Sequence, residues 1–194
     1  IDFVKNGMPK NNKVYAEKVT QKHFNLVKDR SVYYCDEFAV RFCYTKNGYF
    51  SNVVLSLSTL QKYDHIPFFV VLVIGNKDNI LYLANTSLLN KISHSSQQLR
   101  EDNIRGSFLG TNIIKNYSGI PNDAEHIEQL FAIHQEYTWK ENLARLVEAA
   151  SGIKSTKTKF NPNENQKALI FSSVERAKKF IFSADYVSLK TDLD

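Results

Sequence analysis

The chain has 194 residues, of which 43% are hydrophobic and 23% are charged; this composition excludes a wholly disordered protein and fits one folded domain with, at most, a small appendage. Its 25 Lys and Arg residues outnumber its 20 Asp and Glu residues, and the resulting formal charge of +5 favours a polyanionic partner such as nucleic acid. The longest apolar run, residues 66–74, is far shorter than the roughly 20 residues of a membrane-spanning helix, so no membrane contact is expected.

Residues 1–30 are predicted to form a basic arm, which includes Lys5, Lys10 and Lys13, followed by a short helix. The chain begins with Ile rather than Met, so we expect it to be part of a longer protein. Parts of the function, including catalytic residues, could then lie outside this chain.

Residues 33–44 alternate between apolar and polar side chains, with Val40 and Phe42 among the apolar set, and this pattern is typical of a half-buried strand. The dipeptide Asn47-Gly48 follows and predicts a tight turn of the kind that joins hairpin strands. A strand and a turn are therefore expected in the first quarter of the chain.

Three further strands are predicted after this turn. Residues 52–60 alternate again, residues 67–74 are apolar on both faces, and residues 80–85 pair back after a polar turn. Since the connections are short, we expect an antiparallel sheet of four or more strands.

Helical patterns occupy the last third of the chain. Each pattern begins with two residues at the spacing of a capping box, namely Asn122 with Glu125, Thr138 with Glu141, and Asn163 with Gln166. The first two patterns break in phase near Thr138, so they predict either one kinked helix or two helices. The fold class is therefore α+β, with a long ordered loop over residues 90–116 and C-terminal helices packed on the sheet.

The sequence contains no complete restriction-type nuclease motif. A restriction-type nuclease needs an acidic residue and, on a neighbouring strand, Asp or Glu two positions before Lys, because the carboxylates hold Mg²⁺. The nearest match has Ser188 where the acid should precede Lys190. If the chain is nevertheless a divergent nuclease, its candidate Mg²⁺ ligands are Asp64, Asp102 and Asp185; otherwise we expect neither a cofactor nor a bound metal. Enzymatic activity is left open.

Histidine and cysteine residues give weaker signals. His126 and His134 are eight positions apart, which only loosely fits a helical metal site, so both are predicted to lie on a partly exposed polar face. Cys35 and Cys43 are too distant along one extended stretch to pair with each other. We expect both thiols to be reduced and the protein to be cytoplasmic.

Residues 90–116 form a polar segment that is longer than a compact fold requires, so we expect it to contact another molecule. Arg suits guanine edges, Asn and Gln suit adenine edges, and Lys or Ser suits phosphates. The predicted DNA-binding residues are Gln97, Gln98, Arg100, Asn103, Arg105, Ser107, Asn112 and Lys115 of this segment, and Lys154, Lys157 and Lys159 of a basic link. The alternative is a solvated loop that packs on its own apolar residues.

Aromatic residues offer a further possibility for recognition. A base swung out of a duplex stacks between aromatic side chains. The candidates for such stacking are Tyr33, Tyr34, Tyr44, Tyr49, Phe50 and Trp139, although most of them are expected to be in the core.

The stretch "FSNVVLSLSTLQKYDHIPFFVVLVI", followed by "LANTSLLNKISHSSQQLREDNIRGSF", resembles segments of bacterial restriction-modification proteins. The resemblance covers about residues 37–152. It implies a phage-defence protein that recognises DNA, either at a specific sequence or at modified bases. Cleavage would then require a nuclease or motor domain, on the same chain or on another.

We therefore expect residues 31–152 to form a recognition domain that binds double-stranded DNA within a restriction enzyme. Residues 153–194, a basic link with a helix and a terminal strand, are expected to belong to the same domain, and residues 1–30 to form its arm. A divergent Mg²⁺-dependent endonuclease is the first alternative, and a protein-interaction or assembly domain is the second.

Overall fold

The computed structural model describes residues 2–75, 77–92, 99–100, 103–104, 106–151 and 164–181. The chain divides into two compact units, Ile1–Ile153 and Lys154–Asp194. The described part of the second unit is helix α5, Glu164–Ile181, whose apolar residues Leu169 and Phe171 are exposed. The expectation that residues 153–194 belong to the main domain stays a prediction.

The N-terminal residues begin with a short π-helical turn, Phe3–Gly7, and continue into helix α1, Lys13–His23. Asn12 caps α1, because its side-chain oxygen accepts a hydrogen bond from the backbone N–H of Tyr15 at 3.0 Å. The prediction of a short helix here is confirmed. Met8 is buried, so the segment before α1 packs on the domain.

Five strands of the described chain form the main sheet, in the order β1-β2-β3-β5-β6. Their bounds are Val27–Asp29, Val32–Tyr34, Ala39–Thr45, Phe68–Ile74 and Ile80–Leu83. β3 and β5 run parallel, whereas the other neighbours are antiparallel. The fold is α+β, as predicted, but the sheet is mixed and mostly antiparallel, so the prediction of an antiparallel sheet of four or more strands is confirmed only in part.

The connection between β3 and β5 explains the parallel pair. Residues 52–60, predicted as a sheet strand, form β4, Val53–Ser56, and then helix α2, Leu57–Leu60. β4 pairs with β9, Ser107–Leu109, outside the main sheet. Because this segment carries the chain back across the sheet, β5 runs in the same direction as β3. Gly48 does adopt the positive φ of a turn, 77°, but the turn joins no hairpin.

Short elements follow the sheet. β7, Leu99–Arg100, pairs with β8, Asn103–Ile104, and β10, Asn116–Tyr117, pairs with β11, Ile120–Pro121. The 3₁₀ turn Thr86–Leu88 precedes the polar segment, residues 90–116, and a second 3₁₀ turn, Gly110–Asn112, lies within it. The described part of the segment thus includes short strands and one 3₁₀ turn, and the segment ends in β10.

Two helices, α3 (Ile127–Gln135) and α4 (Trp139–Ser151), occupy the region predicted as one kinked helix or two. The predicted cap at Asn122 is wrong. Its side chain instead donates to the carbonyl oxygens of Leu83 and Ile114, both at 2.8 Å, and accepts from the N–H of Leu83. Asn122 therefore ties the strand β6 to the segment before α3, and the helix begins five residues later, at Ile127.

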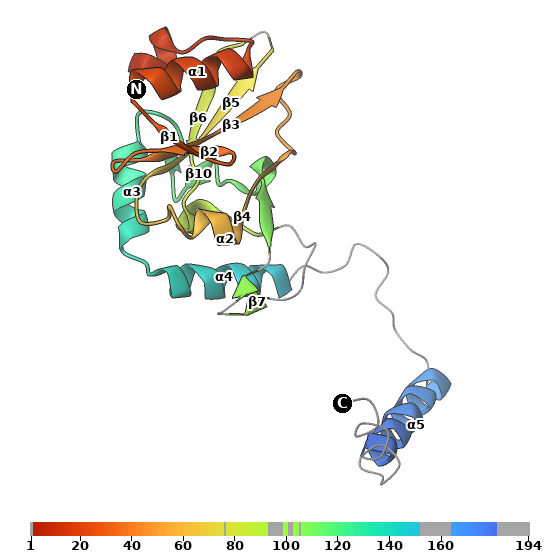
Figure 1. Cartoon of the computed structure of the whole chain (residues 1–194). Helices are drawn as coiled ribbons and strands as arrows, with labels where there is room; N and C mark the ends of the chain where they lie inside the picture. Colours follow the sequence, from red (N-terminus) through yellow and green to blue (C-terminus); the bar gives the residue numbers. More distant parts are fainter. Residues whose placement is uncertain are drawn as a thin grey trace, which may run out of the picture. The chain divides into compact units, whose positions relative to one another are not determined.

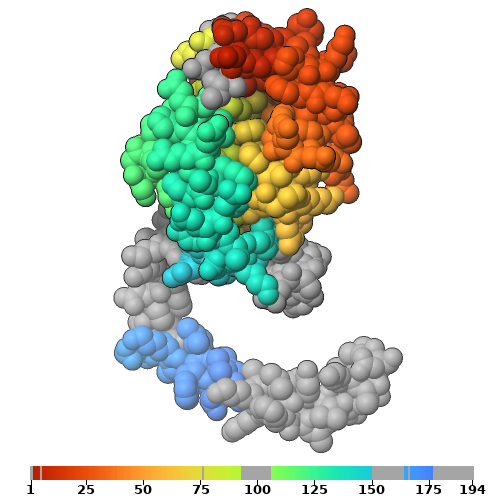
Figure 2. All heavy atoms as spheres, turned by 90° about the vertical axis from the view of Figure 1, so that its left-hand side faces the viewer, coloured from red at the N-terminus to blue at the C-terminus, as the bar shows by residue number. Residues whose placement is uncertain are grey.

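Side chains of the central strands alternate between two cores, and helices cover both faces of the sheet (Figure 1). Val40 and Val71 face α1 and the start of α3. Cys43 and Leu72 face the other way, toward α2, β4, β9 and Leu146 of α4. Figure 2 shows α3 and α4 (teal) and the N-terminal residues (red) on one face of this unit, with the first strands (orange) beside them. Both faces of β5 contact a core, as its apolar sequence predicts.

Candidate functional site

A polar cavity of about 500 Å³ opens where the turn after α2 meets the corner between α3 and α4. It is lined by side chains that include two amides, two imidazoles, one carboxylate and two aromatic rings: Gln61, Asp64, His65, His134, Gln135, Tyr137 and Trp139. A concave site that combines apolar rings with a few polar groups is the common form of a small-ligand site. We therefore treat this polar cavity as the candidate functional site.

The α3–α4 corner places Trp139 by a capping box, as the sequence predicts. The N–H of Thr138 donates to the Glu141 carboxylate at 2.7 Å, and the N–H of Glu141 donates to the Thr138 hydroxyl at 3.3 Å. The hydrogen bonds from Thr138, first that of its backbone and then that of its hydroxyl, hold the pKa of Glu141 below its ordinary value. Trp139 thus becomes the first residue of α4, half-buried against the core and at the cavity wall.

The turn between α2 and β5 forms the opposite wall of the cavity, and hydrogen bonds from Asn85 hold it in place. The Asn85 amide donates to the carbonyl oxygens of Asp64 and Ile66, at 3.0 Å and 2.9 Å, and its side-chain oxygen accepts from the N–H of Phe68. Tyr63, next to Asp64, donates its hydroxyl to Asp29 at 2.7 Å. These bonds fix the backbone that presents Asp64 and His65.

Asp64 and His134 meet at the base of the polar cavity. His134 Nε2 lies 2.7 Å from the backbone oxygen of Asp64, and His134 Nδ1 lies 2.9 Å from the Ser87 hydroxyl. Because a carbonyl oxygen only accepts, Nε2 carries a proton and donates it to Asp64, while Nδ1 is paired with the Ser87 hydroxyl. The prediction of a partly exposed His134 is wrong, since only 5% of this residue is exposed.

Ser87, His134 and Asp64 are the residue types of a hydrolytic triad, but their bonds serve another purpose. The Asp64 carboxylate accepts from both the N–H and the hydroxyl of Thr86. Ser87 is 3% exposed, so its oxygen does not face the cavity opening. The cluster therefore joins α3 to the turn before β5 and to the turn after β6, and it forms a rigid cavity wall.

Arg145 of α4 strengthens the same wall. Its guanidinium donates to the carbonyl oxygens of Thr86 and Leu89, at 2.8 Å and 2.9 Å. Burial lowers the pKa of Arg145. Near it, burial and then the neighbouring Tyr137 raise the pKa of Tyr117. Tyr137 is thereby in contact with both the cavity and β10.

The side chains available to contact a ligand are those that take no part in the hydrogen bonds of the cavity wall. Gln61, His65, Gln135 and Tyr137 are exposed, and Trp139 is half-buried. Of these, sequence reasoning proposed only Trp139. The break in helical phase near Thr138 is an available signal for Gln135 and Tyr137, because it marks the corner beside which they lie; no comparable signal marks Gln61 or His65.

The predicted DNA-binding residues fall into three groups. Arg100 and Asn103 are paired across the β7–β8 hairpin, and β8 contacts α2, the helix that leads to the polar cavity. Lys115 is exposed, Ser107 is half-buried in β9, and Asn112 is 1% exposed, with its side-chain oxygen accepting from the N–H of Leu109 at 2.8 Å. Outside the described residues lie Gln97, Gln98, Arg105, Lys154, Lys157 and Lys159.

The metal alternative rested on three carboxylates. Asp64 is buried and bonded as described above, whereas Asp102 and Asp185 lie outside the described residues. Within the described residues, no three His, Cys, Asp or Glu side chains are grouped so that they could hold a metal ion. The two thiols, Cys35 and Cys43, are free, and burial raises the pKa of Cys43.

Comparison with known proteins assigns no family to the chain. No protein-family model, no curated protein and no solved structure matches it. Of the helices in the described ranges, none is both long enough and apolar enough to cross a membrane.

Proposed function

We propose that the unit Ile1–Ile153 is the double-stranded DNA-recognition module of a restriction system, and that its polar cavity receives one base swung out of the duplex. The observation that supports the proposal is the pairing of two aromatic residues, Tyr137 and Trp139, with two glutamines, Gln61 and Gln135, around one cavity. Extruded bases are held in this way, by stacking on aromatic rings and by hydrogen bonds to their polar edge.

The glutamine amides suit this task because each offers both a donor and an acceptor, as the edge of a base does. His65 adds a further polar group at the mouth of the cavity. Asp64 and His134 are bonded to their neighbours, so they shape the cavity and keep its geometry fixed before the base arrives.

The polar segment supplies the duplex contacts in this proposal. Arg100 and Asn103 lie on a hairpin beside α2, and α2 ends where Gln61 lines the cavity. We propose that this hairpin, within an ordered loop of residues 90–116, enters a groove of the duplex while Lys115 meets a phosphate. Neutralisation of phosphates makes such binding weaken with salt.

The cavity residues are tested by their effect on DNA affinity. Fluorescence anisotropy of labelled duplex, single-stranded DNA and RNA at two salt concentrations gives the dissociation constants of the wild type, of Gln61→Ala with Gln135→Ala, and of Gln129→Ala. Gln129 is the matched control because it is exposed on the same helix, α3, and lies outside the cavity lining. Loss of base contacts predicts affinity weaker by about tenfold or more in the double variant only.

The same titration separates the alternatives. Equal affinities of all three proteins for duplex would contradict the assignment of the cavity. Cleavage of the duplex on addition of Mg²⁺ would favour the endonuclease alternative. No binding to any nucleic acid at low salt would leave the protein-interaction or assembly domain as the better account.

A further inference from the structure

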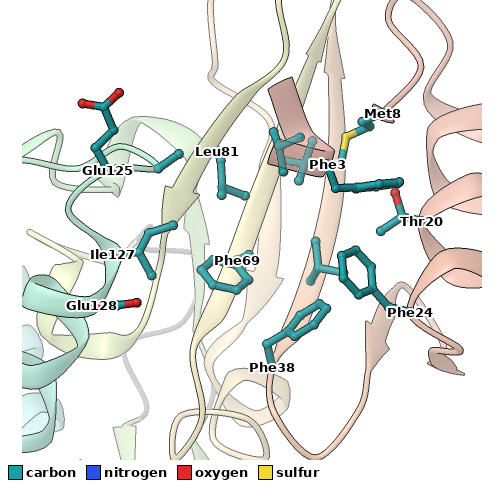
Figure 3. Close-up of a pocket in the computed structure, with 14 residues that line it drawn as sticks. Phe3, Met8, Thr20, Phe24, Phe38, Phe69, Leu81, Glu125, Ile127 and Glu128 are labelled. Carbon is teal, nitrogen blue, oxygen red and sulfur yellow. The ribbon is translucent and has the colours of Figure 1, made fainter. Parts of the chain in front are cut away.

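An apolar groove of about 380 Å³ lies on the face of the sheet between α1 and α3. Its floor is made by Val40, Phe69, Val71 and Leu81, which come from the three strands β3, β5 and β6 (Figure 3). The groove is separate from the polar cavity, since the residues found to line the one do not line the other. Its volume falls within the range of small-molecule sites.

Phenylalanine rings follow one another along this groove. Phe24 lies 5.3 Å from Phe38, and Phe38 lies 5.7 Å from Phe69, measured between ring centroids. Phe3 continues the series, 5.2 Å from Phe24. Phe24 is 39% exposed, so part of this aromatic surface faces solvent. A flat apolar molecule that covered it would remove apolar area from water on both partners.

The groove adjoins a second cavity of about 260 Å³, with which it shares Val4, Leu81, Ala124 and Glu125. Asn79 lines this second cavity. The Asn79 amide donates to the carbonyl oxygen of Pro9 at 3.1 Å, but its buried side-chain oxygen accepts no hydrogen bond from the described part of the chain. A buried acceptor without a partner is costly, and a donor from a bound molecule would satisfy it.

The ionisable side chains that line the two cavities, as far as the structure describes them, are Asp123, Glu125 and Glu128. All three are acidic on a chain whose formal charge is +5. Asp123 also contacts His126, at 2.8 Å, and Glu128 is exposed in the first turn of α3. Because the carboxylates and the Asn79 oxygen all accept hydrogen bonds, the side of the groove next to α3 and the adjoining second cavity are complementary to a positively charged donor.

We propose that the apolar groove binds a small amphipathic cation, with its apolar or aromatic body on the phenylalanines and its ammonium or guanidinium group on the acidic side, where Glu125 and Glu128 line the groove. The two carboxylates favour binding of a cation, and the aromatic floor favours binding of an apolar body. The proposal does not depend on DNA binding, because it uses the opposite end of α3 and different side chains.

Three probes with one common body test this site: 4-phenylbutylamine, 4-phenylbutan-1-ol and 4-phenylbutanoate. Two-dimensional NMR titration of the full chain gives the dissociation constant of each probe and the residues whose signals shift. We expect shifts at Leu81, Ala124 and Ile127, and amine binding at least tenfold tighter than that of the carboxylate.

Two variants distinguish the parts of the site. Glu128 is exposed, and Glu128→Gln should reduce the preference for the amine over the carboxylate at least threefold. The control is Glu136→Gln, which changes an exposed carboxylate at the C-terminal end of α3 and should leave this preference unchanged. Ala124→Phe, if it folds, should block all three probes. Equal affinities of the three probes, shifts confined to other residues, or no shifts at the highest soluble concentration would each overturn the proposal.

Discussion

The Nε2 of His134 lies 2.7 Å from the backbone oxygen of Asp64, although 70 positions separate the two residues in the sequence. This contact joins the C-terminal end of α3 to the turn that precedes β5. Since both residues also line the polar cavity, the contact sets the distance between two of its walls.

Replacement of His134 by Ala should destabilise the unit without any ligand present. The change removes the ring that satisfies the Ser87 hydroxyl and the Asp64 carbonyl in the interior, and a buried polar group left unpaired costs about 1–3 kcal/mol. Urea denaturation measures the free energy of unfolding, with Gln129→Ala as the exposed control. Equal stability of His134→Ala and wild type would show that the contact is not structural.

Asp64→Ala separates the structural role of Asp64 from the metal-binding alternative. The N–H and hydroxyl of Thr86 would lose their acceptor, so we expect a loss of about 1–3 kcal/mol in the free energy of unfolding. The check is thermal denaturation, alongside a Mg²⁺-dependent cleavage assay. A variant that is as stable as wild type but has lost a cleavage activity would support the nuclease alternative instead.

Tyr63→Phe should reduce the dependence of stability on pH. The Tyr63 hydroxyl, followed by Lys62, holds the pKa of Asp29 below its usual 3.8. A carboxyl whose pKa is lower in the folded state stabilises the fold at neutral pH, and this contribution is lost as the pH falls from about 4 through the folded-state pKa. Melting temperatures between pH 7 and pH 2 should fall more steeply for wild type than for Tyr63→Phe. Parallel curves would contradict this assignment.

Arg145→Lys tests the wall behind Tyr137. Lysine keeps the charge but lacks the planar group that reaches two carbonyl oxygens at once, those of Thr86 and Leu89. We expect a loss of about 1–3 kcal/mol in the free energy of unfolding, because the hydrogen bonds come from a charged group. Lys140→Ala, at an exposed position of α4, is the control. A loss no larger than that of the control would show that the hydrogen bonds of Arg145 do not stabilise the fold.

Local features of the fold could be predicted from the sequence. The apolar run predicted a buried central strand, β5, because a strand covered on both faces carries such a pattern. The polar turn after this run predicted that the next strand pairs back, and β5 and β6 are antiparallel neighbours. Thr138 and Glu141 gave the start of α4, because a capping box uses only residues of its own first turn.

Long-range features could not be predicted. The parallel pairing of β3 and β5 depends on residues 52–60 leaving the sheet, although their alternation is equally typical of a sheet strand. Asn122 has capping spacing, yet its amide fits two carbonyl oxygens that only the folded chain brings near it. The polar cavity was missed for the same reason, because Gln61 and Gln135 become neighbours only through tertiary packing.

The emission of Trp139 during a DNA titration tests the central claim most directly, because this residue is the one tryptophan of the chain and lines the polar cavity. Duplexes with and without a single mismatch or a methylated base are added at low and at higher salt. A base in the cavity predicts an emission change that saturates with the affinity seen by anisotropy, weakens with salt, and is reached at lower concentration with the mismatch, whose base costs less to extrude. Duplex binding that leaves the emission of Trp139 unchanged would contradict the claim that the cavity holds a base.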